Sequence, residues 1–173
     1  MTLSSSIFAF VGFLQLRSAI AKIRQPAVFW AILQRYPGIV WVRNSKLALL
    51  VPATEAVLGT GLLLPFFWTR LPAGFGVALF LILASAAIYW RYHRGEKRFA
   101  CGCSTDLAEE LPASAMLLKN ALLFLVTSYA MWAHWKPVSA GDYGLGAALL
   151  LAFDLLDTAL VQEGRIHNWK SVG

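Results

Sequence analysis

The N-terminal stretch LSSSIFAFVGFLQLRSAIAKI, from Leu3 to Ile23, is apolar over most of its length. As an α-helix its 21 positions would extend about 31 Å, enough to cross the hydrocarbon core of a bilayer. A cleaved signal peptide is the alternative, because Ala19-Ile20-Ala21 resembles a cleavage site. However, no Lys or Arg precedes the apolar run, and Arg17 lies just before that site. We therefore predict that this stretch is a membrane span.

Further apolar segments follow along the chain. They predict spans at about residues 47–68, 72–92 and 113–135, and we favour a fifth span at 143–161. Trp and Tyr cluster near the predicted ends, as in the aromatic belts of membrane proteins. These residues are Trp41, Trp68, Tyr89, Trp90, Tyr92, Trp132 and Trp135. The predicted fold is therefore all-α, a polytopic membrane helix bundle with four or five transmembrane helices, and residues 1–173 form a single integral membrane domain.

The composition supports a membrane protein. Of the 173 residues, 58% are hydrophobic and 14% are charged, and the mean hydropathy is +0.62. A soluble domain is nearer half apolar and a quarter charged, so a soluble globule of this composition would expose large apolar patches. Soluble enzymes, disordered tails and nucleic-acid-binding modules are therefore disfavoured.

Two segments are less uniformly apolar than the other spans. Residues 26–42 mix aromatic, aliphatic and polar side chains, which predicts a short amphipathic segment at the membrane surface, ended by Pro37-Gly38. The segment 143–161 contains Asp154 and Asp157, which share one helical face. That face suits either a stripe turned toward the bundle or a helix lying at the interface.

The charges are distributed unevenly between the two faces of the predicted bundle. There are 15 Lys and Arg against 9 Asp and Glu, a net charge of +6. The first loop, the third loop and the C-terminus share one face, which carries eleven of the cations: Lys22, Arg24, Arg35, Arg43, Lys46, Arg91, Arg94, Lys97, Arg98, Arg165 and Lys170. The opposite face carries Arg70 and Lys136. The positive-inside rule would place the first face, with Cys101 and Cys103, in the cytoplasm.

The two cysteines form the motif Cys101-Gly102-Cys103. A disulfide between them would close a small, strained ring, and such a disulfide is easily reduced. The pair is therefore poorly suited to holding a fold together but well suited to exchanging electrons with another dithiol. Lys97 and Arg98 precede it, and neighbouring cations favour the thiolate. Gly102 leaves room for a partner sulfur to approach.

Two other interpretations of the cysteine motif stay open. The residues could form a tight turn without a redox role, or they could bind copper or zinc with help from His93 or His134. Two thiolates without a second Cys or His pair fall short of the four ligands of a closed site. We therefore predict no metal site. The sequence also contains no Ser/His/Asp arrangement, phosphate-binding loop or HExxH motif.

Several polar residues fall inside the predicted spans, where an ionisable group is costly unless it is paired or faces a polar cavity. Glu55 lies nine residues beyond Lys46, about 14 Å along a helix and close to the bilayer midplane. Arg17, Lys119 and Asn120 enter their spans from the face that carries the cysteines.

We expect these residues to form a polar intramembrane pocket beneath the cysteine motif. The predicted pocket residues are Arg17, Lys22, Glu55, Lys119 and Asn120, with Gln15 beside them. Glu55 would pair with Arg17 or Lys119, whereas Lys22 could instead extend to the lipid headgroups. The pocket could hold the helices together, or it could bind a substrate or a proton.

Several short motifs occur in a definite order along the chain. They are Ser18-Ala19-Ile20-Ala21-Lys22, followed by Pro26, Phe29 and Tyr36; Pro52-Ala53-Thr54-Glu55 with Gly59; Cys101-Gly102-Cys103; and Lys119-Asn120-Ala121-Leu122-Leu123. In this order the sequence resembles the MauE family, the methylamine-utilisation membrane proteins, over about residues 8–135. That family is distantly similar to DoxX proteins. The Cys-x-Cys loop together with the Pro-x-x-Glu span is fairly specific, whereas the helices alone are not.

The resemblance implies a multi-pass protein of the bacterial inner membrane that works with a periplasmic thioredoxin-like partner, MauD in methylamine clusters. The client would be a disulfide-containing protein such as the small subunit of methylamine dehydrogenase. Cys101 and Cys103 would be the redox pair of a thiol–disulfide oxidoreductase, and Glu55, Lys22 and Lys119-Asn120 would be the motif residues within the helices. The family is also likened to the quinone-coupled oxidants DsbB and vitamin K epoxide reductase, so quinone is the cofactor that the resemblance implies.

Some features depart from the family or disagree with its role. Ser104-Thr105 replaces the usual aromatic-glycine pair and Ala19 replaces a glycine, although neither change removes a reactive group. Exchange with a periplasmic partner needs the cysteines in the periplasm, whereas the distribution of cations predicts the cytoplasm. The alternative function is a non-catalytic membrane scaffold or transport subunit for maturation of a partner protein, in which the cysteines have no redox role.

Overall fold

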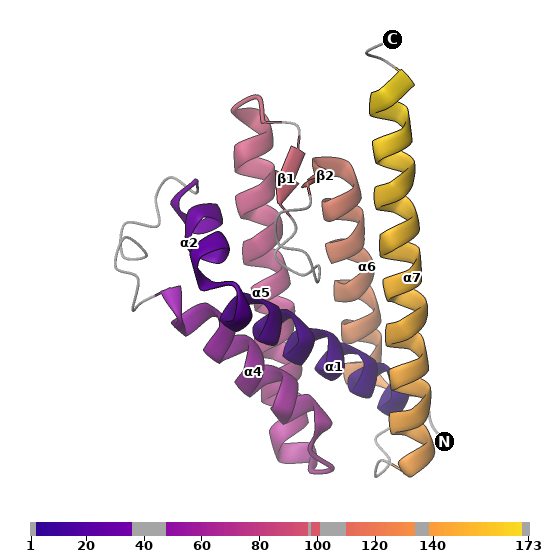
Figure 1. The fold of residues 1–173 in the computed structure, drawn as a ribbon. Coiled ribbons are helices and arrows are strands. Elements are labelled where there is room, and N and C mark those ends of the chain that lie inside the picture. Colours follow the sequence, from indigo (N-terminus) through magenta and orange to yellow (C-terminus); the bar gives the residue numbers. More distant parts are fainter. Residues whose placement is uncertain (1–2, 36–47, 97, 101–109, 134–138, 171–173) are drawn as a thin grey trace.

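The structure is a computed structural model, and it describes residues 3–35, 48–96, 98–100, 110–133 and 139–170. Its helices are α1 (Leu3–Arg24), α2 (Pro26–Gln34), α4 (Leu50–Leu63), α5 (Phe67–His93), α6 (Ala113–Trp132) and α7 (Ala140–Lys170). Two short strands, β1 (Arg98–Ala100) and β2 (Glu110–Pro112), pair antiparallel between α5 and α6. The all-α membrane bundle predicted from the sequence is confirmed (Figure 1).

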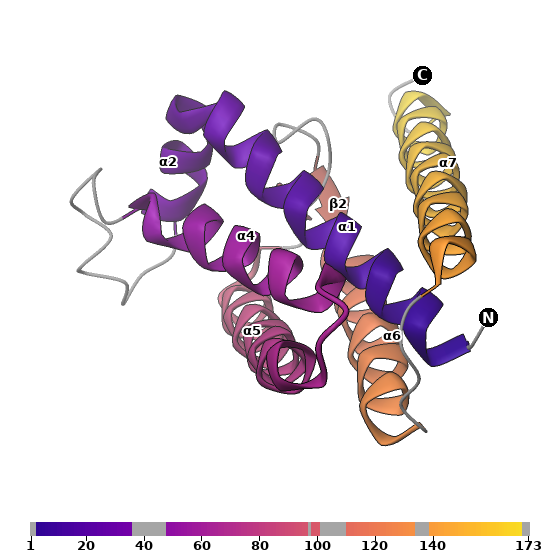
Figure 2. The same ribbon diagram turned by 90° about the horizontal axis from the view of Figure 1, so that it is seen from below.

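Helix α1 lies at the centre of the bundle and packs against α4, α6 and α7. Apolar and small residues surround most of its circumference, as expected for a helix that is buried on several sides. Phe8, Val11 and Leu14 of α1 join Leu62 of α4 and Val77 of α5 in the main core. Figure 2 shows α4 and α7 on opposite sides of α1.

The ends of the elements gather on two sides of the bundle. Figure 1 shows the C-terminal end of α5, the strand pair and the start of α6 on the upper side, whereas α1 crosses the bundle and ends at the left, beside α2. The turn between α4 and α5 and the start of α7 lie on the lower side, and α7 runs back to the upper side. The ends of α5 and α7 therefore lie on one side, in agreement with the face to which the cations of the third loop and the C-terminus were assigned.

The boundary between the second and third predicted spans needs correction. The sequence predicted spans at 47–68 and 72–92, but the chain leaves the helical conformation at residues 64–66. Pro65 explains this break, because a residue before proline avoids the helical conformation, and the residue before it is extended with a ψ of 141°. Pro72 lies inside α5 and does not begin it.

Helix α4 is short for a membrane span. Its 14 residues extend about 21 Å along the helix axis, less than the thickness of the hydrocarbon core. Among the described residues, three helices are long and apolar enough to cross a membrane: Leu3–Arg24, Trp68–His93 and Ala113–Trp132. The predicted fifth span, 143–161, lies inside α7, which is not one of these three. The fifth span therefore stays a prediction.

Two side chains close the C-terminal end of α4. The Nε of Arg70 on α5 donates a hydrogen bond to the Leu64 carbonyl, and the hydroxyl of Tyr143 on α7 donates one to the Leu63 carbonyl. Both hydrogen bonds are 2.6 Å long. The donors satisfy carbonyls that a helix end leaves without an intrahelical partner. Arg70 is therefore a buried cation with a structural role.

The end of α5 directs the chain into β1. Gly95 has a φ of 92°, a left-handed conformation that glycine adopts without the penalty of a side chain. Arg91 in the last turn of α5 is buried and pairs with Glu96, directly after the turn. The strand pair therefore begins at a fixed point on α5.

The predicted amphipathic segment at residues 26–42 is helical over its first part. Helix α2 follows α1 directly and begins with Pro26, which suits the first turn of a helix because its missing N–H would have no intrahelical partner there. Phe29 is buried against Val51 of α4 and Ala21 of α1. The residues Pro37-Gly38, which were predicted to end the segment, lie outside the described residues.

Helices α1 and α4 cross where Gly12 meets Gly59. A Cβ atom added to Gly59 would lie 2.9 Å from the Gly12 carbonyl oxygen, and one added to Gly12 would lie 3.0 Å from the Gly59 carbonyl oxygen. Because both contacts are with backbone atoms, a larger residue would fit only if the helices moved apart. This close crossing determines which faces of α1 and α4 meet.

We expect Gly59→Val to destabilise the protein by about 1–3 kcal/mol, because it overpacks a backbone crossing. Thermal unfolding of the purified protein in detergent measures this change. Gly144→Val is the matched control, since Gly144 is also in a helix but a Cβ there has no neighbour within 4 Å. Its stability should change by about 0.5 kcal/mol or less. Equal stability of the two variants would contradict a tight crossing at Gly59.

Candidate functional site

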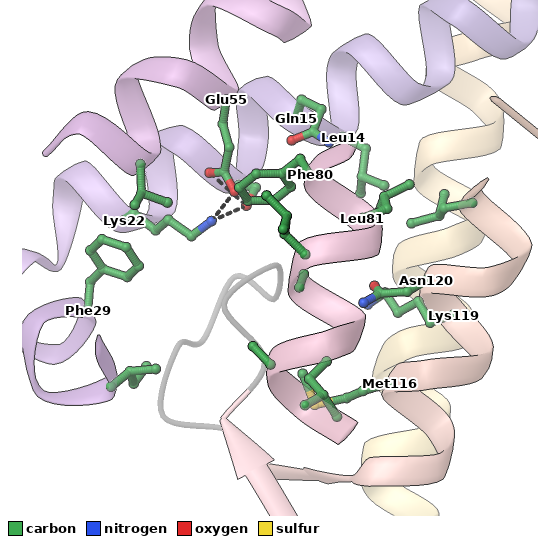
Figure 3. Close-up of a pocket in the computed structure, with 18 of the residues that line it drawn as sticks. Leu14, Gln15, Lys22, Phe29, Glu55, Phe80, Leu81, Met116, Lys119 and Asn120 are labelled. Atoms are coloured by element: carbon green, nitrogen blue, oxygen red, sulfur yellow. Dashed lines mark hydrogen bonds and ion pairs between the residues drawn. The ribbon is translucent and has the colours of Figure 1, made fainter. Parts of the chain in front are cut away.

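A buried ion pair joins α1 to α4. Glu55 has 0% of its surface exposed and Lys22 has 4%, and the Lys22 ammonium donates to Oε1 of Glu55. Ser18 completes the group: its hydroxyl donates to Oε2 of Glu55 at 3.3 Å, and Lys22 Nζ donates to Ser18 Oγ at 3.0 Å (Figure 3). The two opposite charges therefore balance each other inside the bundle.

The predicted partner of Glu55 was wrong. The sequence favoured Arg17 or Lys119, but Glu55 pairs with Lys22, and Lys22 is buried and does not extend to the headgroups. Arg17 and Lys22 are five residues apart, which is about 140° around a helix, so they face different neighbours. Ser18 and Lys22 are four residues apart and share the face that meets α4.

Arg17 lies away from this group and pairs with Asp154 on α7. The side chains of Arg17 and Asp154 are 21% and 28% exposed. Asp154 therefore belongs to a face that is turned toward the bundle, one of the two alternatives for the fifth apolar segment. Nothing is described of the side chain of Asp157.

A cavity of about 290 Å³ lies beside the ion pair, bordered by residues of α1, α2, α4, α5 and α6. Most of its wall is aliphatic or aromatic. Its polar lining residues are Gln15, Ser18, Lys22, Glu55, Lys119 and Asn120. Four of the five residues predicted for the polar pocket therefore line one cavity, and Arg17 does not.

The two polar lining residues of α6 reach different helices. The Nδ2 of Asn120 donates a hydrogen bond to the Ser85 hydroxyl of α5 at 3.2 Å. The Lys119 ammonium lies 4.7 Å from the centre of the Phe153 ring on α7, a cation–π contact. Phe153 does not line the cavity, so the charged end of Lys119 is directed toward α7 while the residue borders the cavity.

Two aromatic residues of the site received no role from the sequence. Phe29 and Phe80 line the cavity, and the Lys22 ammonium lies 5.6 Å and 6.0 Å from the centres of their rings. Aromatic faces attract a desolvated ammonium, so both rings stabilise the charge of Lys22. Phe29 is one of the motif residues on which the family resemblance rests, so the sequence could have indicated a role for it. Phe80 lies in a uniformly apolar run, which offers no such signal.

Cys101 and Cys103 lie outside the described residues, but the strands before and after them are described. Ala100, the last residue of β1, pairs with Glu110, the first residue of β2. The described residues on either side of the cysteine segment therefore lie next to each other.

The strand pair is attached beside the cavity. Leu111 of β2 is buried in a small cluster with Ile88 of α5 and Met116 of α6. Ile88 and Met116 also line the cavity, and Figure 3 shows Met116 on the side of the cavity nearest the strand. The same helical segments thus hold the ends of the cysteine segment and form part of the cavity wall.

The histidines considered as helpers for a metal do not converge on a described site. His93 lies beside the rings of Tyr89 and Tyr92, with centroid distances of 4.4 Å and 6.1 Å. His134 lies outside the described residues. Within the part of the chain that the structure describes, no group of three or more His, Cys, Asp or Glu residues could hold a metal ion.

A second buried polar group lies at the start of α7. Asp142 is 1% exposed and accepts hydrogen bonds from the backbone N–H and the hydroxyl of Ser139, both at 2.8 Å. The Ser6 hydroxyl of α1 donates to the same carboxylate at 3.2 Å. The Ser-x-x-Asp spacing of residues 139–142 is typical of a helix N-terminus, so the sequence could have predicted where α7 begins. This group anchors the start of α7 to α1.

The comparisons with known proteins fit this arrangement. The family model described as methylamine utilisation protein MauE matches residues 1–135, a range that includes the ion pair, the cavity and both cysteines. No match was found among curated proteins or solved structures.

Proposed function

Because this chain belongs to the MauE family of methylamine-utilisation membrane proteins, we propose that it is a thiol–disulfide exchange component with Cys101 and Cys103 as its redox pair. It is a multi-pass protein of the bacterial inner membrane in this proposal. Its partner is a thioredoxin-like protein, and its client is a disulfide-containing protein such as the small subunit of methylamine dehydrogenase.

The observation that carries this proposal is the anchoring of the cysteine segment. Both of its ends are joined through the pairing of Ala100 with Glu110, and Leu111 is packed against α5 and α6. The short strand pair, attached to two long apolar helices, holds the residues that flank the cysteine segment beside α5 and α6. An incidental pair of small residues would not need such an attachment.

The chemistry follows from the spacing of the cysteines. A thiolate of the partner attacks the strained Cys101–Cys103 disulfide, which forms a mixed disulfide and releases one cysteine thiolate of this chain. The second thiolate of the partner then attacks the mixed disulfide and releases the other cysteine. The partner is oxidised to a disulfide, and this chain is reduced to a dithiol by two electrons. Strain in the small ring favours this direction.

Trapping tests the proposal. We expect Cys103→Ala, expressed under oxidising conditions with a thioredoxin-like partner whose second cysteine is replaced by alanine, to accumulate a mixed disulfide through Cys101, because neither chain keeps a second cysteine to resolve it. The mixed disulfide is detected as a band that disappears on reduction. The double variant Cys101→Ala/Cys103→Ala should give no such band and should not support client maturation.

The scaffold alternative makes the opposite prediction. If Cys103→Ala forms no mixed disulfide with any protein under oxidising conditions, and the double alanine variant supports client maturation fully, the redox proposal is wrong. The chain would then act as a non-catalytic membrane scaffold or transport subunit, in which the Glu55 group only holds helices together.

A further inference from the structure

We infer that the cavity between α1, α2, α4, α5 and α6 binds an acyl chain of a membrane phospholipid. Among the described residues, α1, α5 and α6 contain the three segments that are long and apolar enough to cross a membrane, and all three border the cavity. Leu14, Leu81 and Leu123 line the cavity near the middle of these helices. The middle of a span lies in the hydrocarbon core of the bilayer, where the surrounding lipid consists of acyl chains.

The charges of the site select a neutral occupant. The Lys22 ammonium is paired with the Glu55 carboxylate, and the Ser18 hydroxyl donates to Glu55 and accepts from Lys22. The Lys119 ammonium is directed to the Phe153 ring on α7. A phosphate or an ammonium group in the cavity would need a further group of opposite charge, because burying an unpaired charge is very costly. The charged headgroup of a lipid therefore stays outside the cavity.

The wall of the cavity favours hydrocarbon over water. Most of its lining side chains are aliphatic or aromatic. A buried water makes about three hydrogen bonds to polar groups, whereas the polar groups of Ser18, Lys22 and Glu55 bond to one another and Asn120 donates to Ser85. An acyl chain needs no hydrogen bond, and it gains free energy from every apolar contact that it makes with the wall.

The shape of the cavity suits a chain. Its lining extends from Phe80 to Ile88 on α5 and from Met116 to Leu123 on α6, which is about 10–12 Å along each helix. A volume of about 290 Å³ spread over this length is narrow. Leu83 also lines the cavity and is 60% exposed, so the rim of the cavity reaches the outer surface of α5. A chain can therefore enter sideways from the surrounding lipid.

A chain in this position would join α2 to the opposite wall of the cavity. Figure 3 shows Phe29 of α2 on one side and Met116 of α6 on the other. Phe29 packs against Val51 of α4, and Ile32 and Leu33 of α2 line the cavity. The acyl chain would fill the space between these residues and α6. It would therefore act as a packing element of the fold, in addition to the lipid that surrounds the bundle.

Photolabelling of the full-length protein in nanodiscs tests the inference. The probe is a phosphatidylcholine with a diazirine at the end of one acyl chain. We expect it to label Leu14 and Leu123, which line the cavity but are only 5% and 8% exposed. A phosphatidylcholine with the diazirine on its headgroup is the control, and it should not label these two residues. The double variant Cys101→Ala/Cys103→Ala should be labelled as the unmodified protein is.

Two substitutions on α5 form a matched pair for this measurement. Ala84 lines the cavity, whereas Ala86 is exposed on the same helix and does not line it. We expect Ala84→Phe to reduce the labelling of Leu14 about tenfold or more, because the ring fills space that the chain needs, and Ala86→Phe to leave it unchanged. Ala87→Leu is a smaller change at a second lining position. It should also reduce the labelling, and it provides the test if Ala84→Phe does not fold.

Three outcomes would overturn the inference. Labels confined to exposed residues of the bundle, with none at Leu14 or Leu123, would show that no acyl chain enters the cavity. Labelling of Leu14 that is equal in Ala87→Leu, Ala86→Phe and the unmodified protein would place the chain outside the cavity. A molecule without an acyl chain that purifies with the protein in a one-to-one amount and prevents labelling would assign the cavity to that molecule.

Discussion

Lys22→Met is expected to destabilise the protein by about 3–5 kcal/mol, because it leaves the carboxylate of Glu55 buried without its cation. Glu55 is completely buried, and the Ser18 hydroxyl would still donate to it. A neutral hydroxyl does not replace an ammonium. Chemical or thermal unfolding of the purified protein in detergent, compared with the unmodified chain, measures the loss.

The double variant separates the cost of an unpaired charge from the value of the pair. Lys22→Met/Glu55→Leu replaces both charges with apolar side chains, so it should recover most of the stability that Lys22→Met loses. Arg24→Met is the control for loss of a cation, since Arg24 is exposed at the end of α1, and its effect should be about 0.5 kcal/mol or less. A Lys22→Met variant as stable as Arg24→Met would refute the buried pair.

Much of the fold could be predicted because membrane helices are specified by long apolar runs. The segments 3–23 and 113–135 agree with α1 and α6 within a few residues. The break at residues 64–66 was missed because its neighbours are apolar too, and Pro65 was the single signal inside a continuous hydrophobic run. Apolar composition specifies that a segment is buried in lipid or protein, but it does not specify where one helix ends and the next begins.

The candidate site was harder to predict than the fold. Sequence spacing placed Glu55 deep in the membrane and brought Lys119 and Asn120 to the same region, and all three line the cavity. The partner of Glu55 depends on how α1 is rotated about its axis, and this rotation is determined by the close approach of Gly12 and Gly59. A rotation of this kind follows from packing between helices, so no motif within α1 could reveal it.

The structure also changes the meaning of the one-sided distribution of cations. Lys22 is buried against Glu55, Arg91 is buried against Glu96, and Arg94 lies 5.3 Å from the Trp90 ring. On the opposite face, Arg70 is buried and closes the end of α4. Some of the cations on the face assigned to the cysteines therefore stabilise contacts within the bundle. The positive-inside rule concerns cations in the loops, so the buried residues Lys22, Arg70 and Arg91 carry little topological information.

After reduction of the Cys101–Cys103 disulfide, an impermeant thiol reagent is expected to label both cysteines in intact spheroplasts, because the proposed partner is periplasmic. By the positive-inside rule, the remaining loop cations on the face assigned to the cysteines place that face in the cytoplasm. The periplasmic partner and the cation distribution therefore predict opposite results, either labelling or none. Ala140→Cys in a background without Cys101 and Cys103 is the control: residue 140 is exposed at the start of α7, on the side away from the strand pair. It should be labelled only after lysis.

The reverse pattern would change the proposal and not only its orientation. If the native cysteines react only after lysis while the cysteine at position 140 reacts in intact spheroplasts, the motif faces the cytoplasm, where thiols are kept reduced. A strained disulfide there would be reduced rapidly by the cytoplasmic thiol pool. The chain could then not oxidise a periplasmic partner directly. Its cysteines would instead receive electrons from a donor in the cytoplasm.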